Sequence, residues 1–192
     1  KEVETNKKAL LKKDGNIQVG NLAVGKDFPT RIVAEIVDAP KMTNIEIKQK
    51  AVYYANSGAD IIDVGMVAGS SMPRDASRAI DAVKEVVDIP VSIDSMNPIE
   101  IEEAVSAKVD LIVSLDPKNI VEVSKFGTHL PAVVLPTDFR KGLFPRKASE
   151  RLKLLEENIK TSRENGFTKI IADPILDPLV TPGSTESIVA TY

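Results

Sequence analysis

The sequence contains no cysteine, no tryptophan and only one histidine. Without cysteine, the chain forms no disulfide, thiolate nucleophile or thiolate metal site. The single histidine, His129, stands just before a predicted strand, a position typical of a structural residue, and one chain cannot build a two-histidine zinc site from it. No apolar run approaches the roughly eighteen residues of a membrane span, so we expect no membrane partner.

A basic excess is also missing, because the formal net charge is −3 and the pI is about 5.4. This balance argues against nucleic acid as a partner. The amino terminus is rich in Lys and Glu and lacks the apolar core of a secretion signal, which predicts a cytoplasmic location. The content of 43% apolar and 28% charged residues is ordinary for a globular domain with one core.

The chain divides into a short tail and one large domain. Residues 1–15 are charged and predict a surface helix or the tail of an upstream region. Residues 17–25 alternate apolar and polar side chains around a Gly20-Asn21 turn, which predicts a hairpin. We expect residues 16–192 to form the domain, with this hairpin at the bottom of a barrel.

After residue 29 the chain alternates between predicted strands and helices. Thr43 begins a helix with Glu46 completing a capping box, and Asn97 caps another with Pro98 at its first position. Six short apolar runs read as buried parallel strands, at residues 31–37, 60–64, 90–95, 110–115, 132–135 and 169–172.

Two α/β architectures fit this alternation. A doubly wound sheet needs a glycine-rich phosphate loop after its first strand, and residues 37–40 (VDAP) do not supply one. A TIM (β/α)8 barrel fits the uniform repeats, although such barrels have eight strands and about 250 residues. We therefore predict a truncated TIM barrel of about six strands with an N-terminal β-hairpin. Its uncovered edge strands predict self-association, with a homodimer as one form.

The predicted strands deliver mostly acidic side chains to one rim. That composition suits a divalent metal with oxygen ligands or a heterocycle rich in N–H donors. Capping of the following helices is an alternative role for each acid. No Asp-x-Asp, histidine-containing or regular spacing supports a metal site, so none is predicted. The residues at the rim are Glu35, Asp38, Asp63, Asp94, Ser95, Ser114, Asp116, Thr137, Asp138 and Asp173.

Three segments resemble the dihydropteroate synthases. Residues 60–65 (DIIDVG) with 70–74 (SSMPR) resemble their second strand and its loop, and residues 90–95 and 170–174 resemble their third and sixth strands. Residues 94–98 (DSMNP) and Glu35 are closer to the methyltetrahydrofolate:corrinoid methyltransferases of the same pterin-binding superfamily. Overall, the chain from about residue 17 onward is most similar to the archaeal dihydropteroate synthase-related proteins.

The resemblance implies a reduced pterin, of folate or tetrahydromethanopterin type, as the small-molecule partner. It implies that Asp94 and Asp173 read the pterin ring with Ser114 and Arg74 as further substrate-binding residues. It also implies catalytic roles for Glu35 and Asp63, with Mg²⁺ or a corrinoid on a partner protein as further cofactors of the two reactions.

The chain also departs from these families. The first-strand loop that helps the synthases hold magnesium and pyrophosphate reads IVDAPK here, at residues 36–41, and Ser114 stands where both families usually have Asn. The seventh- and eighth-strand residues of the synthases fall beyond Tyr192. Arg140, Lys141, Arg146 and Lys147 suggest a solvated loop, with phosphate binding as the alternative.

These observations favour a dihydropteroate synthase-like transferase that condenses a pterin with an arylamine. One alternative is a methyltransferase that passes a methyl group from a tetrahydropterin to a corrinoid. The other is a non-catalytic domain that binds a pterin or a protein.

Overall fold

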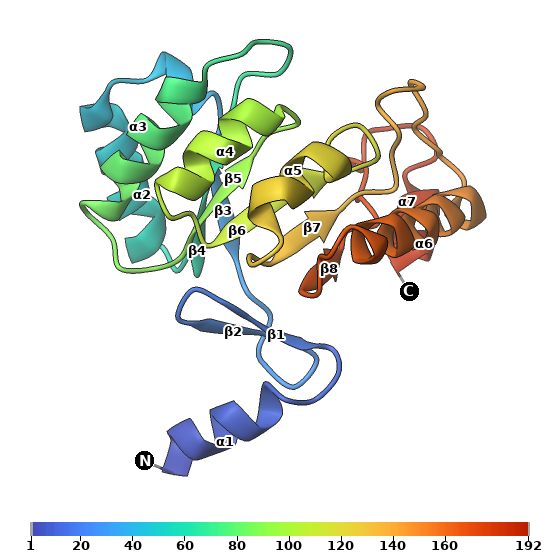
Figure 1. The fold of residues 1–192 in the computed structure, drawn as a ribbon, viewed down its shortest axis with the longest axis horizontal. Helices are drawn as coiled ribbons and strands as arrows, with labels where there is room; N and C mark the ends of the chain where they lie inside the picture. The colour runs from blue at the N-terminus through green and yellow to red at the C-terminus, as the bar shows by residue number, and fades with distance from the viewer. Residues whose placement is uncertain (1, 192) are drawn as a thin grey trace. The chain divides into compact units, whose positions relative to one another are not determined.

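In the computed structural model, which describes residues 2–191, six strands form a sheet in chain order, β3-β4-β5-β6-β7-β8 (Figure 1). The pairs β3/β4, β4/β5 and β7/β8 are parallel. Sequential parallel strands with a helix after each are the arrangement of a (β/α)8 barrel, so the predicted α/β fold is confirmed. The strands are β1 Asn16–Val19, β2 Leu22–Gly25, β3 Val33–Ile36, β4 Ile61–Gly65, β5 Val91–Asp94, β6 Leu111–Leu115, β7 Ala132–Val134 and β8 Ile170–Ala172.

The helices follow the predicted segments closely. The capping box of Thr43 and Glu46 is present at the start of α2, and Asn97 caps α4 through Ile99 N. The helices are α1 Glu2–Leu10, α2 Asn44–Asn56, α3 Pro73–Lys84, α4 Pro98–Ser106, α5 Ile120–Gly127, α6 Ala148–Glu164 and α7 Thr185–Thr191, with a 3-10 turn η1 at Ala39–Lys41.

The chain forms two compact units, residues 1–112 and 113–192. In the first unit every residue of β4 is buried, and β4 lies between β3 and β5. Helix α3 buries Ala76, Ala79, Ile80 and Val83 at helical spacing, and it packs against α2 and α4. This packing fixes β3, β4 and β5, whose carboxyl ends carry three of the predicted site residues.

The antiparallel hairpin β1/β2 lies at the amino-terminal side of the first unit's strands (Figure 1). Its turn residues Gly20 and Asn21 line a pocket of about 370 Å³ with Pro90 and Asp110. Asn21 Nδ2 donates to the carbonyl of Asp88 at 3.3 Å. The hairpin therefore covers the end of the strands opposite to the predicted site.

In the second unit, Arg151 of α6 organises the segment after β8. Arg151 is 4% exposed and donates to the carbonyls of Pro174 and Ile175, while its Nη2 lies 2.9 Å from Asp177 Oδ2. These contacts shape the loop that follows the predicted site residue Asp173.

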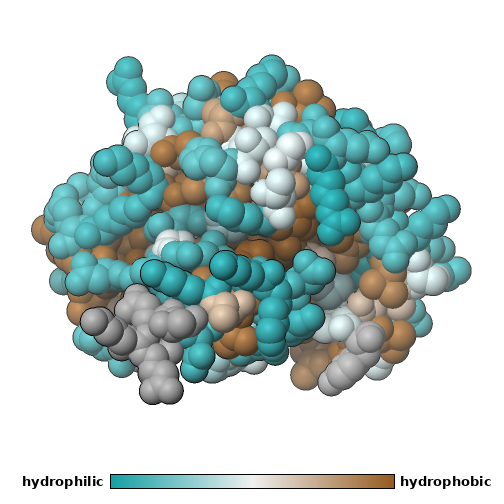
Figure 2. Space-filling view, turned by 60° about the horizontal axis from the view of Figure 1, so that its bottom comes forward, coloured by the Kyte–Doolittle hydropathy of each residue, from teal (hydrophilic) through white to brown (hydrophobic). Residues whose placement is uncertain are grey.

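Hydrophilic residues cover most of the face shown in Figure 2, with apolar residues visible between them. Within residues 2–191, no helix combines the length and apolar character needed to cross a membrane.

Candidate functional site

Strand register places the predicted acids of the first unit side by side. Glu35 of β3 is paired with Asp63 of β4, and Asp63 is paired with Ser92 of β5. Paired residues on adjacent strands project from the same face of a sheet, so these three side chains form one row. Asp94 pairs with Gly65 and adds a carboxylate one step closer to the carboxyl end of β5.

The carboxylates of Glu35, Asp63 and Asp94 each place an oxygen within 4.8 Å of the others. Asp63 is only 5% exposed, Asp94 is half-buried and Glu35 is exposed. Ser92 Oγ donates to Asp63 Oδ1 at 2.6 Å. The structure therefore brings together both predicted catalytic residues and one predicted ring reader.

Burial makes the carboxylate of Asp63 unusually basic. Burial, reinforced by the charges of Asp94 and Glu35, raises the pKa of Asp63 from 3.8 to about 7, and the hydroxyl of Ser92 opposes the rise. Desolvation, with the charges of Asp94 and Asp38, also raises the pKa of Glu35. Near neutral pH the cluster can both hold and release a proton.

Two residues that shape this cluster are not apparent from the sequence. Ser92 lies two residues before Asp94 and so on the same face of β5, and this spacing is the one sequence signal that points to it. Gly65 has no side chain, and a Cβ there would collide with Glu35 Oε1. Both residues act through register, which a single sequence does not reveal.

Arg74 is exposed at the second position of α3. The loop before it is tied to the end of β5, since Met66 N donates to the carbonyl of Asp94 at 3.0 Å. The loop between β4 and α3, which leads to Arg74, is thus joined by a backbone hydrogen bond to β5, the strand that carries Asp94.

Ser114 and Asp173, the other predicted substrate-binding residues, belong to the second unit. Ser114 lies in β6 with φ 72°, a left-handed conformation that is rare for serine, and its carbonyl accepts from Asn119 Nδ2 at 3.0 Å. Asp173 directly follows β8, where its Oδ1 accepts from Ile175 N at 2.7 Å. Asp173 is half-buried and keeps Oδ2 without a partner among the described residues.

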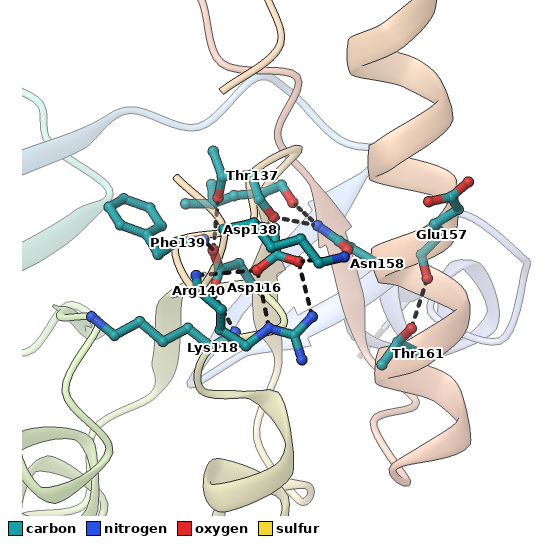
Figure 3. A network of polar contacts seen from close by, with 11 residues as sticks. Asp116, Lys118, Thr137, Asp138, Phe139, Arg140, Glu157, Asn158 and Thr161 are labelled. Atoms are coloured by element: carbon teal, nitrogen blue, oxygen red, sulfur yellow. Dashed lines mark hydrogen bonds and ion pairs between the residues drawn. The ribbon is translucent and has the colours of Figure 1, made fainter. Parts of the chain in front are cut away.

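Asp116 has structural partners in the second unit (Figure 3). It is fully buried and accepts hydrogen bonds from Lys118 N, Thr137 Oγ1 and Phe139 N at 2.7 to 3.1 Å. Asn158 Nδ2 donates to the backbone carbonyls of Leu135 and Thr137 in the same loop. Asp116 therefore fixes the loop after β7.

Asp138 is paired with basic residues of its own loop. Arg140 Nε and Nη2 donate to its two carboxylate oxygens at 3.0 and 2.9 Å, and Lys141 Nζ lies 3.4 Å away. These contacts, led by Arg140, hold the pKa of Asp138 at about 2. Two of the four basic loop residues thus neutralise an acid of the same loop.

The Glu35, Asp63 and Asp94 set fits two kinds of ligand. Three carboxylate oxygens suit a hard divalent cation such as Mg²⁺. The same oxygens suit a planar heterocycle with adjacent N–H groups, which a carboxylate can bind in a fork. Both kinds of ligand would favour the ionised form of Asp63, because a metal ion needs a deprotonated ligand and a fork of two N–H donors needs two acceptor oxygens.

Comparison with known proteins identifies relatives of the chain. Residues 41–188 match the family of pterin binding enzymes. The uncharacterized protein MJ0107 of Methanocaldococcus jannaschii is 37% identical over 181 residues, which cover 92% of this chain and 34% of that protein. The chain thus spans about a third of the length of this relative.

Solved dihydropteroate synthases share the fold. The enzyme of Stenotrophomonas maltophilia matches with a TM-score of 0.73 and 16% identity, covering 92% of this chain and 71% of that chain. The enzyme of Xanthomonas albilineans in complex with 7,8-dihydropteroate matches with a TM-score of 0.68 and 21% identity, covering 92% and 69%. Identities this low establish the fold alone.

Proposed function

Because the chain belongs to the family of pterin binding enzymes, we propose that it binds a reduced pterin at the carboxyl ends of its strands and acts as a dihydropteroate synthase-like transferase. The observation that carries this proposal is the cluster of Glu35, Asp63 and Asp94 on three adjacent strands, with oxygens within 4.8 Å of one another. In this proposal the enzyme belongs to folate or tetrahydromethanopterin metabolism, depending on which of the two pterin types it binds.

The chemistry of the pterin ring explains why acids would line its site. The ring offers an amino group and a neighbouring ring N–H, which one carboxylate accepts as a pair of hydrogen bonds. Asp94 and Asp173 take this role in the proposal, each from the end of a strand. Asp63 supports the pocket from β4, where burial and Ser92 fix its carboxylate.

In the synthase reaction, a bond forms between the arylamine nitrogen and the pterin methylene carbon, while the carbon–oxygen bond to pyrophosphate breaks and the amine loses a proton. The carboxylates would stabilise the positive charge that develops on the pterin ring. Glu35 would take part in this stabilisation as a member of the same carboxylate cluster.

A second candidate, methyl transfer from a tetrahydropterin, is favoured by the raised pKa of Asp63. The pterin N5 must gain a proton before the methyl group leaves, and a corrinoid on a partner protein would supply the acceptor. A carboxyl group with a pKa of about 7 can deliver that proton near neutral pH, since catalytic acids work best near the operating pH. The loop at 36–41, which differs from that of the synthases, is compatible with this reaction.

Isothermal titration calorimetry with a dihydropterin and a methyl-tetrahydropterin tests the proposal. We expect the parent protein to bind one of them, and Asp94→Asn and Asp173→Asn each to weaken binding on the order of tenfold or more, as expected for hydrogen bonds to charged groups. Asp81→Asn is the matched control, because Asp81 is exposed on α3. Absence of binding by the parent would refute the pterin proposal.

Turnover distinguishes the candidate reactions. Release of pyrophosphate with an arylamine supports the synthase, whereas loss of the methyl group to a corrinoid supports the methyltransferase. Binding without either reaction supports the non-catalytic alternative.

A further inference from the structure

Glu100 is a buried carboxylate to which neither proposed reaction assigns a role. It is the third residue of α4 and is 1% exposed. No Lys, Arg or His forms an ion pair with it within residues 2–191. A buried charge without an ionic partner is costly unless hydrogen bonds and dipoles stabilise it.

Two donors from separate loops supply those hydrogen bonds. Met72 N, at the N-cap of α3, donates to Glu100 Oε1 at 2.7 Å, and Ser95 Oγ donates to Oε2 at 2.5 Å. Met72 makes no side-chain cap hydrogen bond, and Glu100 accepts from its backbone N–H, which is the donor from which the side chain of a glutamate at the third helical position accepts in a capping box. The carboxylate is therefore next to the amino-terminal ends of α3 and α4, where helix dipoles favour a negative charge.

The two donors adjoin two predicted site residues. Met72 is two residues before Arg74, and Ser95 directly follows Asp94. A second link joins the same loops, because Asn97 Nδ2 donates to Ser71 Oγ at 2.9 Å. That second link is exposed, whereas the carboxylate of Glu100 is buried and its hydrogen bond from Met72 N is partly buried.

We propose that Glu100 is a positioning residue, whose carboxylate fixes the loop before Arg74 to the end of the strand that carries Asp94. The proposal rests on the proposed pterin site, and it gives a hydrogen-bonded connection between this partly exposed loop and the residue that follows Asp94. Without Glu100, Met72 N would lose this acceptor, whereas the hydrogen bonds from Met66 N to Asp94 and from Asn97 to Ser71 would remain.

Amide hydrogen exchange and pterin calorimetry on the same variants test this role. Glu100→Ala should speed exchange selectively in residues 66–72 and weaken pterin binding on the order of tenfold, because small misplacements of binding groups are costly. Glu100→Gln should restore much of both, since its amide can accept from Met72 N and donate to Ser95 Oγ. Glu102→Ala removes an exposed carboxylate from the same helix and should change neither.

Ile101→Val controls for general destabilisation, since Ile101 is fully buried on α4 but contacts neither donor through a hydrogen bond. Unchanged exchange in residues 66–72 of Glu100→Ala would overturn the proposal, as would faster exchange with unaltered affinity. Equal effects in Ile101→Val would also overturn it. If the parent protein binds no pterin, the proposed function fails, and loop exchange alone decides whether Glu100 holds the loop.

Discussion

The carboxylate of Glu35 occupies the space beside Gly65 that a side chain at that position would need. A Cβ at position 65 would collide with Glu35 Oε1 and lie 3.1 Å from Cδ. Because Gly65 is paired with Asp94, the glycine lets Glu35 extend across β4 to within 4.8 Å of Asp94. The missing side chain of Gly65 is thus a condition for the carboxylate cluster.

Gly65→Ala should displace Glu35 while leaving the fold nearly intact. The colliding atom is the end of a flexible side chain, so we expect a change of about 1 kcal/mol or less in the free energy of unfolding. Pterin affinity should fall, and the fall should vanish in a Glu35→Ala background. Calorimetry on the two single variants and the double variant measures this coupling; equal losses in both backgrounds would contradict it.

The pKa of Asp63 should make stability depend on pH between about 4 and 7. Unfolded Asp63 titrates near 3.8 and the folded residue near 7, so the native state binds more protons in this window. The stability that the bound proton of Asp63 contributes is therefore fully present below pH 4, and it is lost as the pH rises to 7. Asp63→Asn should flatten this slope and stabilise the protein at pH 8 by roughly a few kcal/mol.

Urea denaturation across this pH range measures the effect of Asp63→Asn. Asp81→Asn, at an exposed position of α3, should keep the parent's slope. If Asp63→Asn shows the same pH dependence of the free energy of unfolding as the parent, Asp63 does not have a raised pKa.

Much of the fold follows from local patterns. The apolar run at residues 60–64 and the capping box at Thr43 and Glu46 predict β4 and α2 within a residue or two. These signals suffice because caps and buried parallel strands depend on side chains close together in the chain.

The site is less predictable, because acids at strand ends look alike in sequence. Asp63 and Asp116 both follow apolar runs, but Asp116 is satisfied by Thr137 and Phe139, which lie more than twenty residues away. In the sequence, Glu100 is an acid in the first turn of a helix, a position that suits the helix dipole, yet its carboxylate contacts Met72, twenty-eight residues earlier. Long-range contacts decide which acids remain available to a ligand.

Arg140 should protect the protein against acid through Asp138. The folded pKa of Asp138 is about 2 and its ordinary value is 3.8, so this pairing stabilises the protein above pH 4 and is lost as pH falls to 2. Arg140→Met should lower stability at pH 5, and its difference from the parent should shrink between pH 4 and 2. Thermal denaturation at several pH values measures this.

Arg146→Met is the matched control for Arg140→Met. Arg146 is exposed on the same loop and has no ion-pair partner among the described residues. A loss in Arg146→Met as large as that in Arg140→Met would assign the effect to net charge instead.

The edge of β3 should promote self-association. Strand β3 is at the end of the sheet order, and Ile32, Val33 and Val37 are 50 to 58% exposed. An apolar edge strand with unpaired backbone groups is a template for another chain. Val33→Lys should therefore reduce association in sedimentation velocity, whereas Val52→Lys, on an exposed helical position, should reduce it less. A monodisperse parent monomer would refute this expectation.

Ser114 combines backbone strain with a proposed role in binding, and two substitutions separate these properties. The left-handed conformation of Ser114 costs about 1–2 kcal/mol for a residue with a Cβ, and glycine avoids this cost. Ser114→Gly should therefore be more stable than Ser114→Ala by about 1 kcal/mol in urea denaturation. Both variants lack the hydroxyl, so both should bind the pterin more weakly than the parent, to a similar extent. Equal stabilities would show that the conformation of Ser114 stores no strain, and parental affinity in both would remove Ser114 from the site.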